Sequence, residues 1–296
     1  MAHQDELGAA VATIASGVAR WSRSKVNPMS NNLDALTLVL ATQRSGSTLL
    51  CRDIECLGGL GDPRESFLGL AEQAERESVS EDDVLERIAR GATESDPGIG
   101  AVKMMVGQAL TVDAVIRGGP RRGQLVALRH VVEWAIGRFE RVFMVILVRN
   151  ALDQAISHVV ASSTGLFHAS DVADIRAASA ADLVPENLNP LILAQLQRFL
   201  GQRRVLTRIG EEHADRALML SYDELTRQTE RTTARLVAHA RAQGFAPHCT
   251  SVTRTMKKVI DEDISNRLRE SFLAYLSTET GLQVQKNRTP TSPEPL

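Results

Sequence analysis

A short run of small and hydroxylated residues carries one arginine between a candidate strand and a candidate helix. It is residues 43–48, Gln-Arg-Ser-Gly-Ser-Thr. Small residues let the backbone wrap around an anion, and the N–H groups and dipole at the start of a helix attract it by up to about 1 kcal/mol. Arg44 adds a full charge, and Ser47 and Thr48 add hydroxyl donors. The pattern predicts a phosphate- or sulfate-binding loop; the alternative is a polar turn that only caps a helix.

This loop departs from the nucleotide triphosphatase motif GxxxxGK[ST]. No lysine follows Gly46, and no glycine stands five residues before it. The later apolar run 142–148 ends in Arg149 rather than in the aspartate that would help to hold Mg²⁺. We therefore predict an anion site without a metal. A transferring sulfuryl group carries less negative charge than a phosphoryl group, so arginine, lysine and backbone donors suffice to stabilise its transfer.

A second cationic turn follows the run 142–148. Arg149 ends this candidate strand, and Ser157 lies further on in a helix whose apolar face includes Ile156 and Val159. The carboxyl end of a strand faces the crevice in which α/β sheets bind ligands. Arg149 and Ser157 are therefore candidates to hold a second phosphate, whereas the alternative for Arg149 is a solubilising residue at a strand end.

Alternating elements are expected to position these turns. Four apolar runs predict strands at 36–41, 99–105, 142–148 and 217–221. Each is followed by a stretch with helical character, and Gly58 and Gly59 end the helix that follows the anion loop. Such alternation predicts an α/β fold, a P-loop-type parallel sheet flanked by helices. The charged stretch 72–96 is expected to form a solvated helix and loop.

The chain is expected to divide into a main domain and two terminal segments. Residues 1–32 are predicted to form an amphipathic helix and a linker, 33–282 the main domain, and 283–296 a flexible tail. The helix stripe at the N-terminus packs either on the main domain or on a partner, so a homodimer is possible. Long helices are predicted at 185–209 and 264–276.

Composition narrows the classes of protein. The 296 residues are 43% apolar and 24% charged, and the formal net charge of −2 gives no general attraction for nucleic acid. The three cysteines form no CxxC pair, which argues against a zinc site or a disulfide scaffold. No apolar run is long enough to cross a bilayer, and the acidic N-terminus is unlike a signal peptide. A soluble, cytoplasmic protein is expected.

Several blocks of the chain resemble the Stf0-type sulfotransferases, whose known member sulfates trehalose. The blocks are residues 43–50, 61–67, 148–150 and 154–157, with weaker similarity at 102–104 and 221–223. The resemblance extends over about residues 36–280. It implies a sulfotransferase fold and transfer of a sulfuryl group from 3′-phosphoadenosine 5′-phosphosulfate (PAPS) to a hydroxyl.

The resemblance also implies residue roles in donor binding. The 5′-phosphosulfate would be cradled by Arg44, Ser45, Gly46, Ser47 and Thr48. Arg149 and Ser157 would bind the 3′-phosphate that distinguishes PAPS from ATP. A basic cluster of Arg254, Lys257 and Lys258 is a candidate to cover the nucleotide.

For catalysis, the resemblance matches Glu65 to the general base of the family. A placed carboxylate that accepts the hydroxyl proton contributes roughly 10²- to 10⁴-fold to the rate. Lys103 is expected to neutralise the bridging oxygen or the sulfuryl group, and His158 is the competing base. Ser66 stands where the family commonly has an aromatic residue, so trehalose itself is not assigned as the acceptor. A small carbohydrate or a glycolipid is expected instead.

Two other functions remain as alternatives. One is an atypical P-loop kinase, which the missing lysine and the missing magnesium aspartate disfavour. The other is a noncatalytic nucleotide-binding domain that keeps the anion loop without turnover. Selective binding of the 3′-phosphorylated nucleotide without Mg²⁺ would favour the sulfotransferase over the kinase.

Overall fold

The computed structural model describes residues 33–165, 183–254 and 262–286. The helix predicted within 1–32 lies outside these ranges, as do Lys257, Lys258 and the end of the predicted tail.

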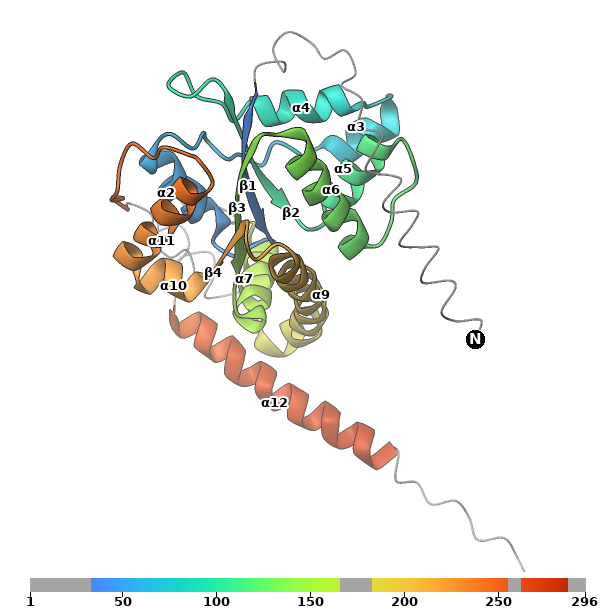
Figure 1. The fold of residues 1–296 in the computed structure, drawn as a ribbon. Coiled ribbons are helices and arrows are strands. Elements are labelled where there is room, and N and C mark those ends of the chain that lie inside the picture. The colour runs from blue at the N-terminus through green and yellow to red at the C-terminus, as the bar shows by residue number, and fades with distance from the viewer. Residues whose placement is uncertain (1–32, 166–182, 255–261, 287–296) are drawn as a thin grey trace, which may run out of the picture.

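Four parallel strands form the central sheet, in the order β2-β1-β3-β4 (Figure 1). They are β1 (Ala35–Ala41), β2 (Ile99–Met105), β3 (Arg141–Val148) and β4 (Ala217–Ser221). Every residue of β1 and β2 is buried, as expected for strands of a parallel sheet with both faces covered. The four predicted strands and the α/β fold class are therefore confirmed.

Helices cover both faces of the sheet. Side chains of β1 alternate between them, so that Leu38 and Leu40 pack on one face and Val39 packs on the other. The Val39 face is covered by α2 (Ser47–Leu57), α10 (Tyr222–Arg227) and α11 (Thr229–Ala242), on the left in Figure 1. The opposite face is covered by α4 (Glu81–Ala89), α5 (Ala109–Arg117), α6 (Gln124–Arg138) and part of α9 (Pro185–Glu212).

A third apolar cluster joins three helices near the carboxyl ends of the strands. It contains α7 (Ala151–Thr164), the first half of α9 and α12 (Glu262–Lys286), with Phe199 and Phe272 fully buried between them. Both long helices extend beyond their predicted ends. Helix α12 continues past the predicted domain boundary at 282. Among the described residues, no helix has the length and apolar character needed to span a membrane.

The charged stretch 72–96 differs from its prediction. It holds the end of α3 (Leu70–Arg76) and the whole of α4, rather than one solvated helix and a loop. Ser80 begins α4 with a capping box, because its hydroxyl accepts a hydrogen bond from the Asp83 N–H while Asp83 accepts one from the Ser80 N–H. Val84, Leu85 and Ile88 are buried in the core. The high charge of this segment concealed an apolar helix face.

The strand order creates a switch point between β1 and β3. From β1 the chain first forms β2 on one side and later β3 on the other. Ligands of open α/β sheets bind beside such a point, at the carboxyl ends of the strands. The loop after β1 and Arg149 after β3 both lie at this edge.

Candidate active site

The anion loop joins β1 to α2 through a left-handed turn. Gly46 has φ of 92°, and Arg44 has φ of 61°, the sole positive φ of a non-glycine residue in the described part of the chain. The side chain of Ser45 is fully buried, and its hydroxyl has no hydrogen-bond partner among the described residues. An unsatisfied buried hydroxyl in a loop at a helix N-terminus fits an anion-binding role.

Gln154 holds the start of the anion loop by hydrogen bonds. This α7 side chain is buried, and its Nε2 donates hydrogen bonds to Thr42 Oγ1 at 2.5 Å and to the carbonyl oxygen of Gln43. The sequence blocks included Gln154 but suggested no role for it. Its contact with residues more than a hundred positions earlier is not visible in the local sequence.

The structure brings together the arginines and the serine that were predicted to bind phosphates. Arg149 Nη1 donates to the carbonyl oxygen of Arg44 at 2.8 Å, and Arg44 Nε donates to Ser157 Oγ at 3.2 Å. The Arg44 side chain therefore lies against Ser157, a residue assigned from the sequence to the other phosphate. The two predicted anion pockets adjoin one another.

Burial disfavours the charged forms of the two arginines in this cluster. It lowers the pKa of Arg44, and the nearby charge of Arg149 lowers it further. Burial also lowers the pKa of Arg149, whose Nε is buried without a hydrogen-bond partner among the described residues. Two guanidinium groups held close together in a partly desolvated site favour an anion as ligand.

Tyr222 connects Arg149 to the anion loop. The Arg149 guanidinium carbon lies 4.2 Å from the centre of the Tyr222 ring, a cation–π contact. A Cβ atom on Gly46 would come within 2.5 Å of Tyr222 Cδ2, so this position accepts only glycine without a shift of the ring. In the sequence, residues 221–223 show only a weak similarity to the family, and nothing there indicates this contact.

Glu65 lies in the loop after α2 and is attached to the edge of the sheet. Its neighbour Arg64 pairs with Val102 as a parallel bridge, and the Lys103 N–H donates to the Arg64 carbonyl oxygen at 2.8 Å. Glu65 Oε2 then lies 3.1 Å from Lys103 Nζ. The other oxygen, Oε1, accepts a hydrogen bond from Gln108 Nε2 at 3.2 Å. The structure thus pairs two residues predicted from the sequence and adds Gln108.

The other predicted candidates lie apart from this pair. His158 is half-buried beside Phe199, with 5.7 Å between ring centres, and burial together with Arg198 and Arg44 lowers its pKa. Arg254, which the sequence suggests as a cover for the nucleotide, is bound to other groups of the protein. It pairs with the buried Asp53, and its Nη1 donates to Thr229 Oγ1 at 2.9 Å. Its donors hold α2 against the segment that joins α10 to α11.

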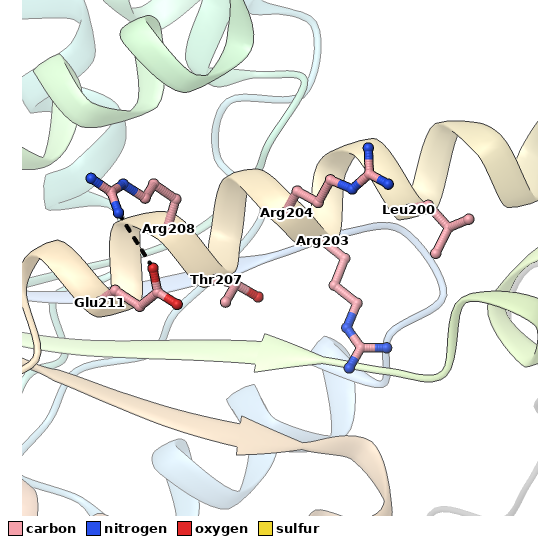
Figure 2. Close-up of a pocket in the computed structure, with 6 residues that line it drawn as sticks. All are labelled: Leu200, Arg203, Arg204, Thr207, Arg208 and Glu211. Carbon is pink, nitrogen blue, oxygen red and sulfur yellow. Dashed lines mark ion pairs between the residues drawn. The ribbon is translucent and has the colours of Figure 1, made fainter.

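A hollow elsewhere does not belong to this site. It measures about 410 Å³, lies along α9 and is lined by Leu200, Arg203, Arg204, Thr207, Arg208 and Glu211 (Figure 2). All six residues come from one helix, and Arg208 pairs with Glu211 at 3.6 Å. None of them is a predicted site residue.

Comparison with known proteins identifies the family. No curated protein matches the chain. A sulfotransferase from Alicyclobacillus acidocaldarius is 14% identical, with 80% of this chain and 91% of that chain covered and a TM-score of 0.41. The sulfotransferase domain of the Synechococcus PCC 7002 olefin synthase is 15% identical, with 84% and 91% covered and a TM-score of 0.38. The model of the family described as Stf0 sulphotransferase matches residues 37–270, from β1 into α12. Because this match spans most of the chain, the protein belongs to the Stf0 sulphotransferase family and is a sulfotransferase.

Proposed function

We propose that this sulfotransferase uses PAPS as its donor and transfers the sulfuryl group to a hydroxyl of a carbohydrate or glycoconjugate, with Glu65 as the general base. The observation that carries the proposal is the contact of Arg44, Arg149 and Ser157 beside the anion loop. A donor with phosphate groups at both ends of one adenosine needs two adjoining anion sites, and these residues come from the loops and helices that follow neighbouring strands.

Each end of the donor has its own set of groups in this proposal. The anion loop from Arg44 to Thr48 holds the 5′-phosphosulfate, with Ser45 Oγ and the first N–H groups of α2 as donors. Arg149 and Ser157 hold the 3′-phosphate. Arg44 already contacts Ser157, so its guanidinium lies between the two ends and interacts with both charges.

Transfer requires a proton acceptor for the attacking hydroxyl. The acceptor oxygen forms a bond to sulfur while the bond from sulfur to the 5′-phosphate oxygen breaks, and Glu65 takes the hydroxyl proton. The products are the sulfate ester and 3′-phosphoadenosine 5′-phosphate (PAP). Lys103, whose Nζ lies 3.1 Å from Glu65 Oε2, is proposed to stabilise charge that develops on the sulfuryl oxygens or on the bridging oxygen. The reaction is proposed to take place in the cytoplasm.

The experiment is a search for sulfated products. The purified protein is incubated with PAPS and a cell extract that contains sugars and glycolipids, and products heavier by one sulfuryl group are sought by mass spectrometry. We expect such products with the wild type and not with Glu65→Gln. Products that appear with ATP instead of PAPS would support the kinase alternative. Binding of PAP without any product would support a noncatalytic domain.

A further inference from the structure

We propose that Gln108 is a positioning residue, which holds the Glu65 carboxylate in its reactive orientation without adding charge. This inference rests on the proposed role of Glu65 as the base. Gln108 lies just after β2, at the start of α5, and none of the sequence motifs includes it.

The hydrogen bonds of Gln108 fix which way its amide points. Gln108 Oε1 accepts a hydrogen bond from the Met105 N–H at 2.8 Å. Since only the oxygen of the amide can accept a hydrogen bond, Nε2 must face the other way. There it donates to Glu65 Oε1 at 3.2 Å. The backbone at the end of β2 thus aims the amide donor at the carboxylate.

Two donors from the same part of the sheet then determine the plane of the carboxylate. Lys103 on β2 holds Oε2, and Gln108 just after β2 holds Oε1. The bridge between Arg64 and Val102 attaches the Glu65 loop to the same strand. Glu65 lies on a loop, and its side chain is 30% exposed. A base on a loop keeps its geometry only if neighbouring groups fix it, and a misplacement of about 1 Å can cost about 10²-fold in rate.

The neutral amide is suited to this task. A second cation at position 108 would stabilise the ionised carboxylate further and make it a weaker proton acceptor. An amide orients the carboxylate and reduces its basicity less than a cation would, because a hydrogen bond from a neutral donor lacks the full ion-pair attraction. Lys103 supplies the charge, and Gln108 supplies the second point of attachment.

Two variants of Gln108 test this role, with ³⁵S-labelled PAPS as donor and the pooled sugar and glycolipid extract as acceptor. Gln108→Met keeps the approximate length and removes the donor. We expect kcat to fall about 10- to 100-fold, with little change in the half-saturating PAPS concentration. Gln108→Glu places a like charge beside Glu65. Because that charge opposes ionisation, the acidic limb of the pH–rate profile should move to higher pH.

The matched control is Gln243→Glu, which makes the same change of charge at the other edge of the sheet. Gln243 donates to the carbonyl oxygen of Asp215 at 3.2 Å, and the carbonyl oxygen of the neighbouring Gly244 accepts a hydrogen bond from Arg141 Nη1, at the start of β3, at 2.9 Å. We expect this variant to keep the wild-type rate and pH profile. A merely structural effect of Gln108→Glu would lower the rate at every pH without moving the acidic limb.

The outcomes separate this inference from the proposed function. If Glu65→Gln abolishes transfer while both Gln108 variants keep the wild-type rate and pH profile, Gln108 has no positioning role and Glu65 remains the base. If Glu65→Gln transfers as fast as the wild type, or the wild type transfers no label, the proposed function itself is wrong and the role of Gln108 is lost with it.

Discussion

Replacement of the proposed base should lower kcat, whereas replacement of an arginine proposed to bind the donor should weaken nucleotide binding. Glu65 lies against Lys103 and Gln108, whereas Arg44 lies against Ser157 and Arg149. Glu65→Gln keeps the size of the side chain and removes the proposed proton acceptor. We expect kcat to fall roughly 10²- to 10⁴-fold.

Binding of PAP is the control for this variant, because the substitution leaves the residues proposed to bind the nucleotide unchanged. Calorimetry should give the wild-type affinity for PAP with Glu65→Gln. A variant that retains a tenth or more of the wild-type kcat would contradict the role of Glu65.

Residue types predicted part of this site and not the rest. Arg44, Arg149 and Ser157 stand in motifs whose position after strands already suggested an anion site, and the structure brings them into contact. Gln108 and Tyr222 contact residues that lie far away in the chain. Nothing in the few residues around an isolated glutamine or tyrosine distinguishes it from a surface residue, so only the fold could reveal these two.

Among the elements, the turn from β1 into α2 depends on Gly46. A side chain there would adopt the left-handed conformation at φ of 92° and would collide with the Tyr222 ring at 2.5 Å. We expect Gly46→Ala to lower the free energy of unfolding by more than the roughly 1–2 kcal/mol that left-handed backbone costs. It should also weaken PAP binding, because Tyr222 contacts Arg149.

Gly118→Ala is the matched control for this turn. Gly118 ends α5 with φ of 63°, and a Cβ there would meet nothing within 4 Å. It therefore shares the backbone cost and lacks the collision. Equal losses of stability in the two variants, with unchanged PAP binding in both, would show that the contact of Tyr222 with the loop has no effect on the site.

Elements with strong apolar patterns were predicted well, and those with mixed patterns were not. The strands β2 and β4 have their predicted bounds, because a short apolar run that alternates with helices in the chain fits few structures other than a strand of a parallel sheet. The segment from β2 to β3 was expected only to have helical character, and it holds both α5 and α6. Helix α12 extends further than its apolar positions indicated, since its ends carry mostly polar residues.

At the scale of the whole molecule, two half-buried histidines should make stability fall in mild acid. Burial lowers the pKa of His158 and of His239. The unfolded chain then binds protons near the ordinary histidine pKa of about 6.5, whereas the folded protein binds them only at lower pH. Stability should be full above about pH 6.5 and should fall as the pH drops from there towards the folded pKa values.

Thermal unfolding at several pH values tests this prediction. His239 packs against Phe143, with 5.6 Å between ring centres. Phe143 is near the start of β3, whereas the anion loop lies at the carboxyl ends of the strands. We expect His239→Gln to show a smaller decrease in Tm between pH 7 and pH 5 than the wild type. The same decrease in both proteins would mean that other groups cause it.

The whole chain has a net charge of −2, so its affinity for an anionic donor has to come from the local cluster of arginines. Composition alone could say no more than this. The strand order that puts the loop after β1 next to Arg149 after β3 depends on how distant segments pair, and no local pattern encodes that order. The family resemblance suggested roles for Arg44, Arg149 and Ser157, and the fold shows that these residues lie close together.

The most direct measurement of the central claim is calorimetric titration of PAP and of ADP without Mg²⁺, into the wild type, Arg149→Ala and Arg141→Ala. Arg141 begins β3, the strand that Arg149 follows, and it pairs with Asp34 at 2.9 Å. It serves as the control. We expect the wild type to bind PAP at least about 10-fold more tightly than ADP, since a hydrogen bond to a charged group contributes about 1.5–3 kcal/mol. Arg149→Ala should remove this preference, and Arg141→Ala should keep it. Equal affinity of the wild type for PAP and ADP, or an unchanged preference in Arg149→Ala, would contradict a donor site built on Arg44 and Arg149.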